Sequence, residues 1–212
     1  MEFLTAYQDG AYAARYRALV EKAKAAEAAQ APGRCGLAEA VARYLFKLMA
    51  YKDEYEVARL YTDGTFEKQI RNEVGGENLK LEFHLAPPLL ARRDPATGMP
   101  RKMHFGPWMM SAFKLLARMK FLRGTAFDIF GYSEERKTER KLVADYEALL
   151  DEVLGKLNAD NHPLAVGLAA IPEKIRGYGH VKARHLIAAK ADEAALLEQL
   201  RSGVVPMMKA AE

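Results

Sequence analysis

The sequence has little of several residues that would point to particular classes of protein. It contains one cysteine, Cys35, in 212 residues. A single cysteine excludes a disulfide within the chain, and it excludes a cysteine-ligated iron–sulfur cluster, which needs about four thiolates. The longest apolar runs fall far short of the roughly 18 residues that suggest a membrane span. No secretory signal opens the sequence, so we expect a protein of the reducing cytoplasm with no membrane partner.

Two common catalytic signatures are also missing. The sequence has neither a Gly-x-x-x-x-Gly-Lys-Ser/Thr phosphate loop nor a Gly-x-Ser-x-Gly nucleophile elbow. Cys35 follows Arg34, but no companion base is placed beside it, so we expect an ordinary thiol. His84 and His104 are two potential metal ligands without a third, which favours a polar sheet face over a zinc site. We therefore assign no catalytic residue and no metal ligand.

The apolar pattern is mainly that of helices. Half of the residues are hydrophobic and 28% are charged, which is typical of a folded domain with a polar surface. Apolar residues recur at steps of three and four through most of the chain. We predict one mainly α domain over residues 1–212, with about six to eight helices. They include 3–30, a helix capped by Asp53, one from Trp108 to Gly124, one capped by Ser133, and 181–201.

Several apolar stretches are expected to lie in the core. The first helix carries two neighbouring stripes: Leu4, Tyr7, Ala11, Ala14 and Ala18, and Tyr12, Tyr16, Leu19 and Ala23. A stripe of Trp108, Ala112, Leu115, Met119 and Leu122 follows later in the chain, and Phe127, Ile129 and Phe130 form a short apolar loop. We predict that these residues are buried.

Near residues 79–105 the period changes to that of a β-strand. Leu79, Leu81, Phe83 and Leu85 alternate with polar residues, and residues 101–105 alternate again. Pro87-Pro88 and the stretch Asp94 to Gly98 break the pattern between them. We predict an antiparallel hairpin with a long tip, in which His84 faces His104 if the centre lies near residue 94.

Charge is unevenly spread, although the net charge is only +4. Residues 92–123 hold eight bases and one acid, residues 134–160 hold eight acids and five bases, and residues 173–190 hold five bases and one acid. A solvated face, or a basic partner for the acidic helix, explains this most simply. Nucleic-acid binding would need exposed aromatics among the bases, and we expect Trp108, Phe113 and Phe121 to be core residues. Nucleic acid is therefore the least favoured partner.

One basic group could bind an anion. His180, Lys182 and Arg184 lie near the start of the last helix, where backbone N–H groups are free to donate hydrogen bonds to an anion. Arg101 and Lys102 could join them on the phosphates of coenzyme A. A tight turn between two helices is the simpler interpretation of Gly177 and Gly179.

Six segments, in order, resemble one enzyme family. They are Phe3 to Gln8, Tyr51 to Thr62, Phe83 to Leu90, Phe105 to Trp108, Leu122 to Gly131, and Ile175 to Lys182. Over about residues 3–205 the chain resembles the C-terminal region of the large, fused indolepyruvate ferredoxin oxidoreductases, a branch of the 2-oxoacid:ferredoxin oxidoreductases.

The resemblance implies a parent enzyme that oxidatively decarboxylates aryl 2-oxoacids. That family uses thiamine diphosphate with Mg²⁺, iron–sulfur clusters and coenzyme A, and it passes electrons to ferredoxin. Its diphosphate pattern begins Gly-Asp-Gly, whereas Gln8-Asp9-Gly10 and Thr62-Asp63-Gly64 lack the first glycine. No catalytic residue or cofactor ligand of the family can therefore be carried onto this chain. We expect a non-catalytic C-terminal domain that supports the catalytic regions or a subunit interface.

Overall fold

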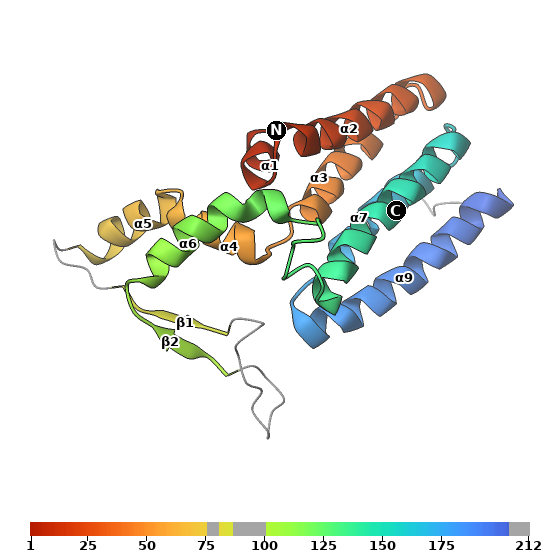
Figure 1. Cartoon of the computed structure of the whole chain (residues 1–212). Helices are drawn as coiled ribbons and strands as arrows, with labels where there is room; N and C mark the ends of the chain where they lie inside the picture. The colour runs from red at the N-terminus through yellow and green to blue at the C-terminus, as the bar shows by residue number, and fades with distance from the viewer. Residues whose placement is uncertain (76–80, 87–100, 204–212) are drawn as a thin grey trace. The chain divides into compact units, whose positions relative to one another are not determined.

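A computed structural model describes residues 1–75, 81–86 and 101–203 (Figure 1). These residues form nine α-helices, two short 3-10 helices and one two-stranded antiparallel sheet, which confirms a mainly α fold with a single hairpin. Their contacts define two compact units, residues 1–51 with 137–212, and residues 52–136. A single domain over residues 1–212 remains a prediction.

The first unit is built from helices. They are α1 (Glu2–Tyr7), α2 (Gly10–Gln30), α3 (Leu37–Met49), most of α7 (Glu134–Lys156), α8 (His162–Ala170), the 3-10 helix η2 (Ile171–Lys174) and α9 (Gly179–Ser202). Leucines, valines and alanines from α2, α3, α7, α8 and α9 form one continuous core. This unit therefore has the larger of the two hydrophobic cores found in the described residues.

The first helix breaks at Gln8 and Asp9, which sequence periodicity did not predict. The Asp9 carboxylate accepts a hydrogen bond from the Tyr12 N–H at 2.8 Å, so it caps a new helix. The break changes the helical phase. Leu4 and Tyr7 are buried as predicted, but Ala11, Ala14 and Ala18 of the same predicted stripe are exposed. The second predicted stripe, through Tyr12, Tyr16, Leu19 and Ala23, does face the core.

α2 and α3 form an antiparallel pair. Residues near the end of α2 meet the start of α3, and Tyr12 and Tyr16 donate hydrogen bonds to the carbonyls of Met49 and Ala42, each at 3.0 Å. Tyr7 donates to the Tyr51 carbonyl at 3.0 Å. The Tyr12 and Tyr7 hydroxyls satisfy carbonyl groups at and beyond the end of α3, where helical partners run out.

α7 and α9 run side by side in the same direction (Figure 1). Lys182 pairs with Glu139 at 2.5 Å near the start of both helices, and Arg201 pairs with Glu152 at 2.7 Å near their ends. α8 returns the chain between them. The acidic helix and the last basic segment are therefore partners in one unit, which is one of the two interpretations that the charge pattern left open.

The second unit is smaller and is built around α4 and α6. It contains α4 (Glu54–Thr62), α5 (Thr65–Val74), β1 (Phe83–Leu85), β2 (Met103–Phe105), α6 (Met109–Arg118) and the 3-10 helix η1 (Met119–Leu122). Its core joins Ala58, Phe83 and Phe113, and the ring of Tyr61 stacks on Phe113 at 5.0 Å between centroids. Capping of α4 by Asp53 and of α7 by Ser133 is confirmed by bonds to the N–H groups of Glu56 and Arg136.

The hairpin has the predicted register. His84 pairs with His104, and Phe83 pairs with Phe105 on the opposite face. Each strand has only three residues, which is shorter than the predicted span. Leu79, the Pro87-Pro88 break and the turn at 94–98 lie outside the described residues.

Two burial predictions in this unit are wrong. α6 turns Phe113 inward with Leu116 and Ala117, so Trp108 and Leu115 of the predicted stripe are exposed. Phe121, Phe127 and Ile129 are also exposed, whereas Phe130 is half-buried and its ring meets Tyr55 edge-on. The helix is apolar on two faces, and periodicity alone could not choose between them.

Candidate functional site

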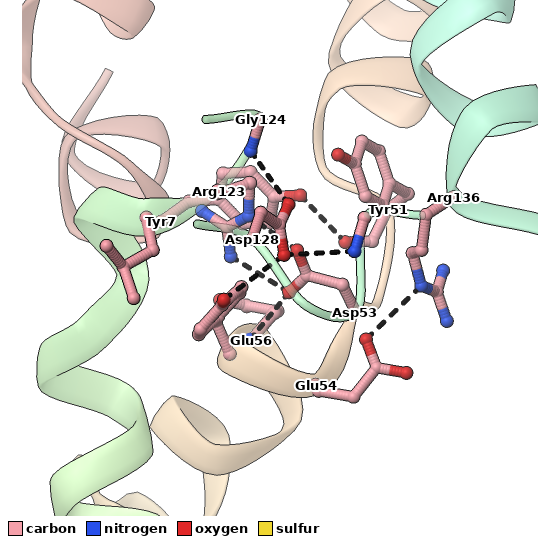
Figure 2. Close-up of polar contacts among 12 residues, drawn as sticks. Tyr7, Tyr51, Asp53, Glu54, Glu56, Arg123, Gly124, Asp128 and Arg136 are labelled. Carbon is pink, nitrogen blue, oxygen red and sulfur yellow. Dashed lines mark hydrogen bonds and ion pairs between the residues drawn. The ribbon is translucent and has the colours of Figure 1, made fainter. Parts of the chain in front are cut away.

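A buried polar cluster lies in the second unit, where α4 meets the segment after η1. Arg123 binds Asp53 through two bonds, with Nε 2.5 Å from Oδ2 and Nη2 2.9 Å from Oδ1. Asp53 also caps α4 through the Glu56 N–H, at 2.9 Å. Figure 2 shows Asp53 and Arg123 meeting beside Asp128. A two-point pair of this kind fixes the guanidinium plane and so the path of the chain around residue 123.

Asp128 is the second centre of this cluster. Its carboxylate accepts hydrogen bonds from the Gly124 N–H at 2.8 Å, the Gly131 N–H at 3.0 Å and the Tyr55 hydroxyl at 3.1 Å. The bond from Gly124 is drawn in Figure 2. Because Gly124 and Gly131 stand at the two ends of one loop, the buried carboxylate closes that loop and ties it to α4.

Two further acids of α4 are paired at this site. Glu56 accepts two bonds from Arg59, both at 2.8 Å, and Glu54 lies 3.3 Å from Arg136. Burial raises the pKa of Glu54 in spite of the nearby Arg136. Burial and the charge and hydrogen bond of Asp128 also raise the pKa of the Tyr55 hydroxyl well above its usual value. Tyr55 therefore stays a hydrogen-bond donor at any physiological pH.

This cluster has the chemistry of a structural brace. Its carboxylates accept bonds from backbone N–H groups, a tyrosine and arginines, all within the same unit. A general acid or base needs a proton-transfer path to a substrate, and these groups instead fix α4, residue 123 and the loop to one another. The sequence analysis did not predict this cluster. The only member that it identified was Asp53, as the cap of α4.

A second buried acid, Glu27, organises the first unit. Its carboxylate accepts bonds from the N–H groups of Leu37 at 2.8 Å and Ala38 at 3.0 Å, and it lies 2.7 Å from Nε2 of His162. Burial acts to raise the pKa of Glu27, but the bonds from His162 and the two N–H groups outweigh it and hold the pKa below the usual value for a glutamate. Glu27 thus caps α3 and links it to α8.

The predicted anion-binding residues are divided between the two units. Lys182 is engaged by Glu139 at 2.5 Å. His180 and Arg184 are exposed four residues apart on α9, while Lys182 turns to another side of that helix because successive residues are about 100° apart. Arg101 and Lys102 are exposed in the other unit, just before β2. Binding of coenzyme A by these five residues stays a prediction.

The two histidines of the hairpin lie side by side, as the strand register requires. His84 and His104 face each other with ring centroids 5.1 Å apart, and His104 bonds Glu82 at 2.9 Å. Within the described residues, no three His, Cys, Asp or Glu side chains are grouped so that they could hold a metal ion. A cavity of about 10 Å³ between α3, α7, η2 and α9 has room for about one water.

Comparisons with known proteins identify a family but no activity. No curated protein and no solved structure matches the chain. In residues 1–75, 81–86 and 101–203, no helix combines the length and apolar character that crossing a membrane requires. One family matches residues 1–195, and its description is "Family of unknown function (DUF6537)". Because this match covers most of its length, the chain belongs to that family.

Proposed function

We propose that this chain is a non-catalytic domain of an indolepyruvate ferredoxin oxidoreductase-like enzyme of the cytoplasm. The parent reaction is the coenzyme A-dependent oxidative decarboxylation of aryl 2-oxoacids, with electrons passed to ferredoxin. Thiamine diphosphate, Mg²⁺ and the iron–sulfur clusters belong to other regions of the parent enzyme. The domain's role is to support those catalytic regions or a subunit interface.

The exposure of large apolar side chains in the second unit carries this proposal. Trp108, Leu115, Phe121, Phe127, Ile129 and Tyr132 are each more than half exposed. Single exposed apolar residues are common on protein surfaces, but several on one short stretch are typical of a surface that another protein covers. A domain that supports a larger enzyme needs such a surface.

The buried carboxylates support a scaffolding role rather than a chemical one. Asp53, Asp128 and Glu27 each accept bonds that fix the position of a helix start or a loop. Their groups contribute shape and rigidity, which is what a supporting domain provides. In this account the reacting groups come from the catalytic regions of the parent enzyme.

The experiment is a paired assay of the 212-residue chain and the native polypeptide from its source. We expect the native polypeptide to be longer and to transfer electrons from an aryl 2-oxoacid to ferredoxin. We expect the 212-residue chain alone to give no turnover and to hold no thiamine diphosphate. Turnover by the isolated chain, or a native polypeptide of only this length, would overturn the proposal.

The alternative is a module that binds coenzyme A or another anion around Lys182 and Arg184. The start of α9 favours it, because no side chain caps this helix and His180, Lys182 and Arg184 lie in its first two turns. The Lys182–Glu139 pair opposes it, since an anion would have to compete with that carboxylate. Calorimetry with coenzyme A decides: binding that weakens with salt supports the alternative, and no heat at low salt rejects it.

A further inference from the structure

The loop from Gly124 to Gly131 buries a charged side chain and exposes apolar ones. Asp128 is buried, with 3% of its surface exposed, while its neighbours Phe127 and Ile129 are 76% and 58% exposed. Charged side chains are normally solvated and apolar ones buried, so this arrangement is unfavourable for a loop whose only neighbour is water. A surface that meets another protein removes the unfavourable exposure.

Hydrogen bonds hold the apolar side chains in their outward direction. The Asp128 carboxylate binds both ends of the loop and Tyr55 of α4. The Thr125 hydroxyl donates to the Leu122 carbonyl at 2.7 Å, and the Tyr132 hydroxyl donates to the Ala126 carbonyl at 2.8 Å. The loop is therefore ordered before any partner arrives, which lowers the conformational entropy that binding would cost.

The charge of the neighbouring surface indicates the chemistry of the partner. From Arg101 to Ser133 the only acid is Asp128, which is buried, and two exposed acids, Glu134 and Glu135, follow at the start of α7. Lys114 and Arg118 are exposed on α6. A surface with apolar side chains and bases at one side is complementary to an apolar surface with an acidic rim. A second copy of the same face would bring like charges together, which opposes symmetric self-association.

We propose that residues 121–132, with Lys114 and Arg118, form a docking surface for a protein surface that is apolar at its centre and acidic at its rim. This inference rests on the proposed function, because we place that acidic surface on the catalytic regions of the parent enzyme. A protein partner fits best because the loop has one fixed shape, which a fluid lipid surface does not require. Phe121, Phe127 and Tyr132 expose rings of the kind that stack on nucleic-acid bases, so binding of an oligonucleotide is the outcome that would overturn this choice.

The test is hydrogen exchange of the isolated chain and of the full-length parent enzyme. We expect residues 121–132 to exchange at least about tenfold more slowly in the full-length enzyme. Lys114→Glu with Arg118→Glu in the full-length enzyme should remove most of that protection. The matched control is Arg17→Glu with Lys24→Glu, two exposed bases on α2 of the other unit, which should leave it unchanged.

The outcomes separate this inference from the proposed function. Slower exchange elsewhere in the chain but not at residues 121–132, or protection that survives the charge reversal, overturns the docking surface and leaves the proposed function standing. No newly protected segment anywhere counts against both, and the paired turnover assay then decides whether the proposed function itself fails.

Trp108, the one tryptophan of the chain, gives an independent test of other partners. It is exposed at the start of α6, in the same unit as this surface, so its emission in the isolated chain should be that of a solvated ring. Vesicles of phosphatidylcholine and phosphatidylglycerol, or a thymidine oligonucleotide, should not shift it. A blue shift or quenching with either probe at physiological salt overturns the choice of a protein partner, and so does concentration-dependent self-association.

Discussion

Arg123 and Asp53 form a two-point ion pair whose side chains are only 6% and 3% exposed. The pair connects the start of α4 to the residue just before the loop from Gly124 to Gly131, which we call the outward loop because Phe127 and Ile129 point to solvent. Removing one partner from such a pair leaves a buried charge without compensation, which is more costly than never having had the pair.

We expect Arg123→Met to destabilise the chain by about 3 kcal/mol, within the usual range for breaking a buried pair. Urea unfolding followed by circular dichroism measures it. The matched control is Arg43→Met, because Arg43 and Glu39 form an exposed pair at 3.0 Å; it should cost less than about 1 kcal/mol. An equal loss of unfolding free energy in the two variants would show that the Arg123–Asp53 pair does not stabilise the fold more than an exposed pair does.

Tyr55→Phe should loosen the outward loop without unfolding the protein. The substitution removes the 3.1 Å bond to Asp128 and leaves the ring in place against Phe130. A single hydrogen bond to a charged group contributes about 1.5–3 kcal/mol. Hydrogen exchange at the Gly124 and Gly131 N–H groups should become faster, while exchange in α2 and α3 stays the same. Unchanged exchange at both glycines would contradict this role of Asp128.

Glu27→Gln should remove a contribution to stability that depends on pH. The folded-state pKa of Glu27 is lowered from its usual value. The carboxylate therefore stabilises the fold above its unfolded pKa, and this contribution is lost as the pH falls through the folded pKa. The variant should be less stable than the parent sequence at neutral pH, and the difference should shrink toward about pH 3. Urea midpoints at several pH values measure it, and a difference that grows on acidification would contradict the account.

Gly177, just before α9, and Gly179, its first residue, should respond differently to alanine. Gly177 has φ +86°, and an added Cβ would lie 2.8 Å from Cγ1 of Val181, whereas Gly179 has φ +54° and open space around it. Gly179→Ala carries only backbone strain of about 1 kcal/mol. Gly177→Ala adds a clash that Val181 must relieve, so its melting temperature should fall further. Equal melting temperatures would rule out this packing at the turn.

The sequence was informative where one face of an element is clearly apolar. The alternation around Phe83 and Phe105 predicted the register that pairs His84 with His104. The same reasoning failed for α6 because two faces of this helix are apolar. The packing of Phe113 against Phe83 and Tyr61 determines which of the two faces is buried.

The outward loop could not be predicted from composition. Hydrophobicity alone places Phe127 and Ile129 in the core, yet the three bonds to Asp128 determine which side chains point inward. One of those bonds comes from Tyr55 of α4, which is 73 positions away in the sequence. The partners of Glu27 were hidden for the same reason, since His162 lies 135 positions away.

An experimental structure of the full-length enzyme tests the central claim most directly, through the solvent exposure of Phe127 and Ile129. If this chain is a supporting domain, both side chains should be buried against an apolar surface with acidic residues around it. Finding both still in contact with water, in an enzyme that is otherwise complete and active, would contradict the account.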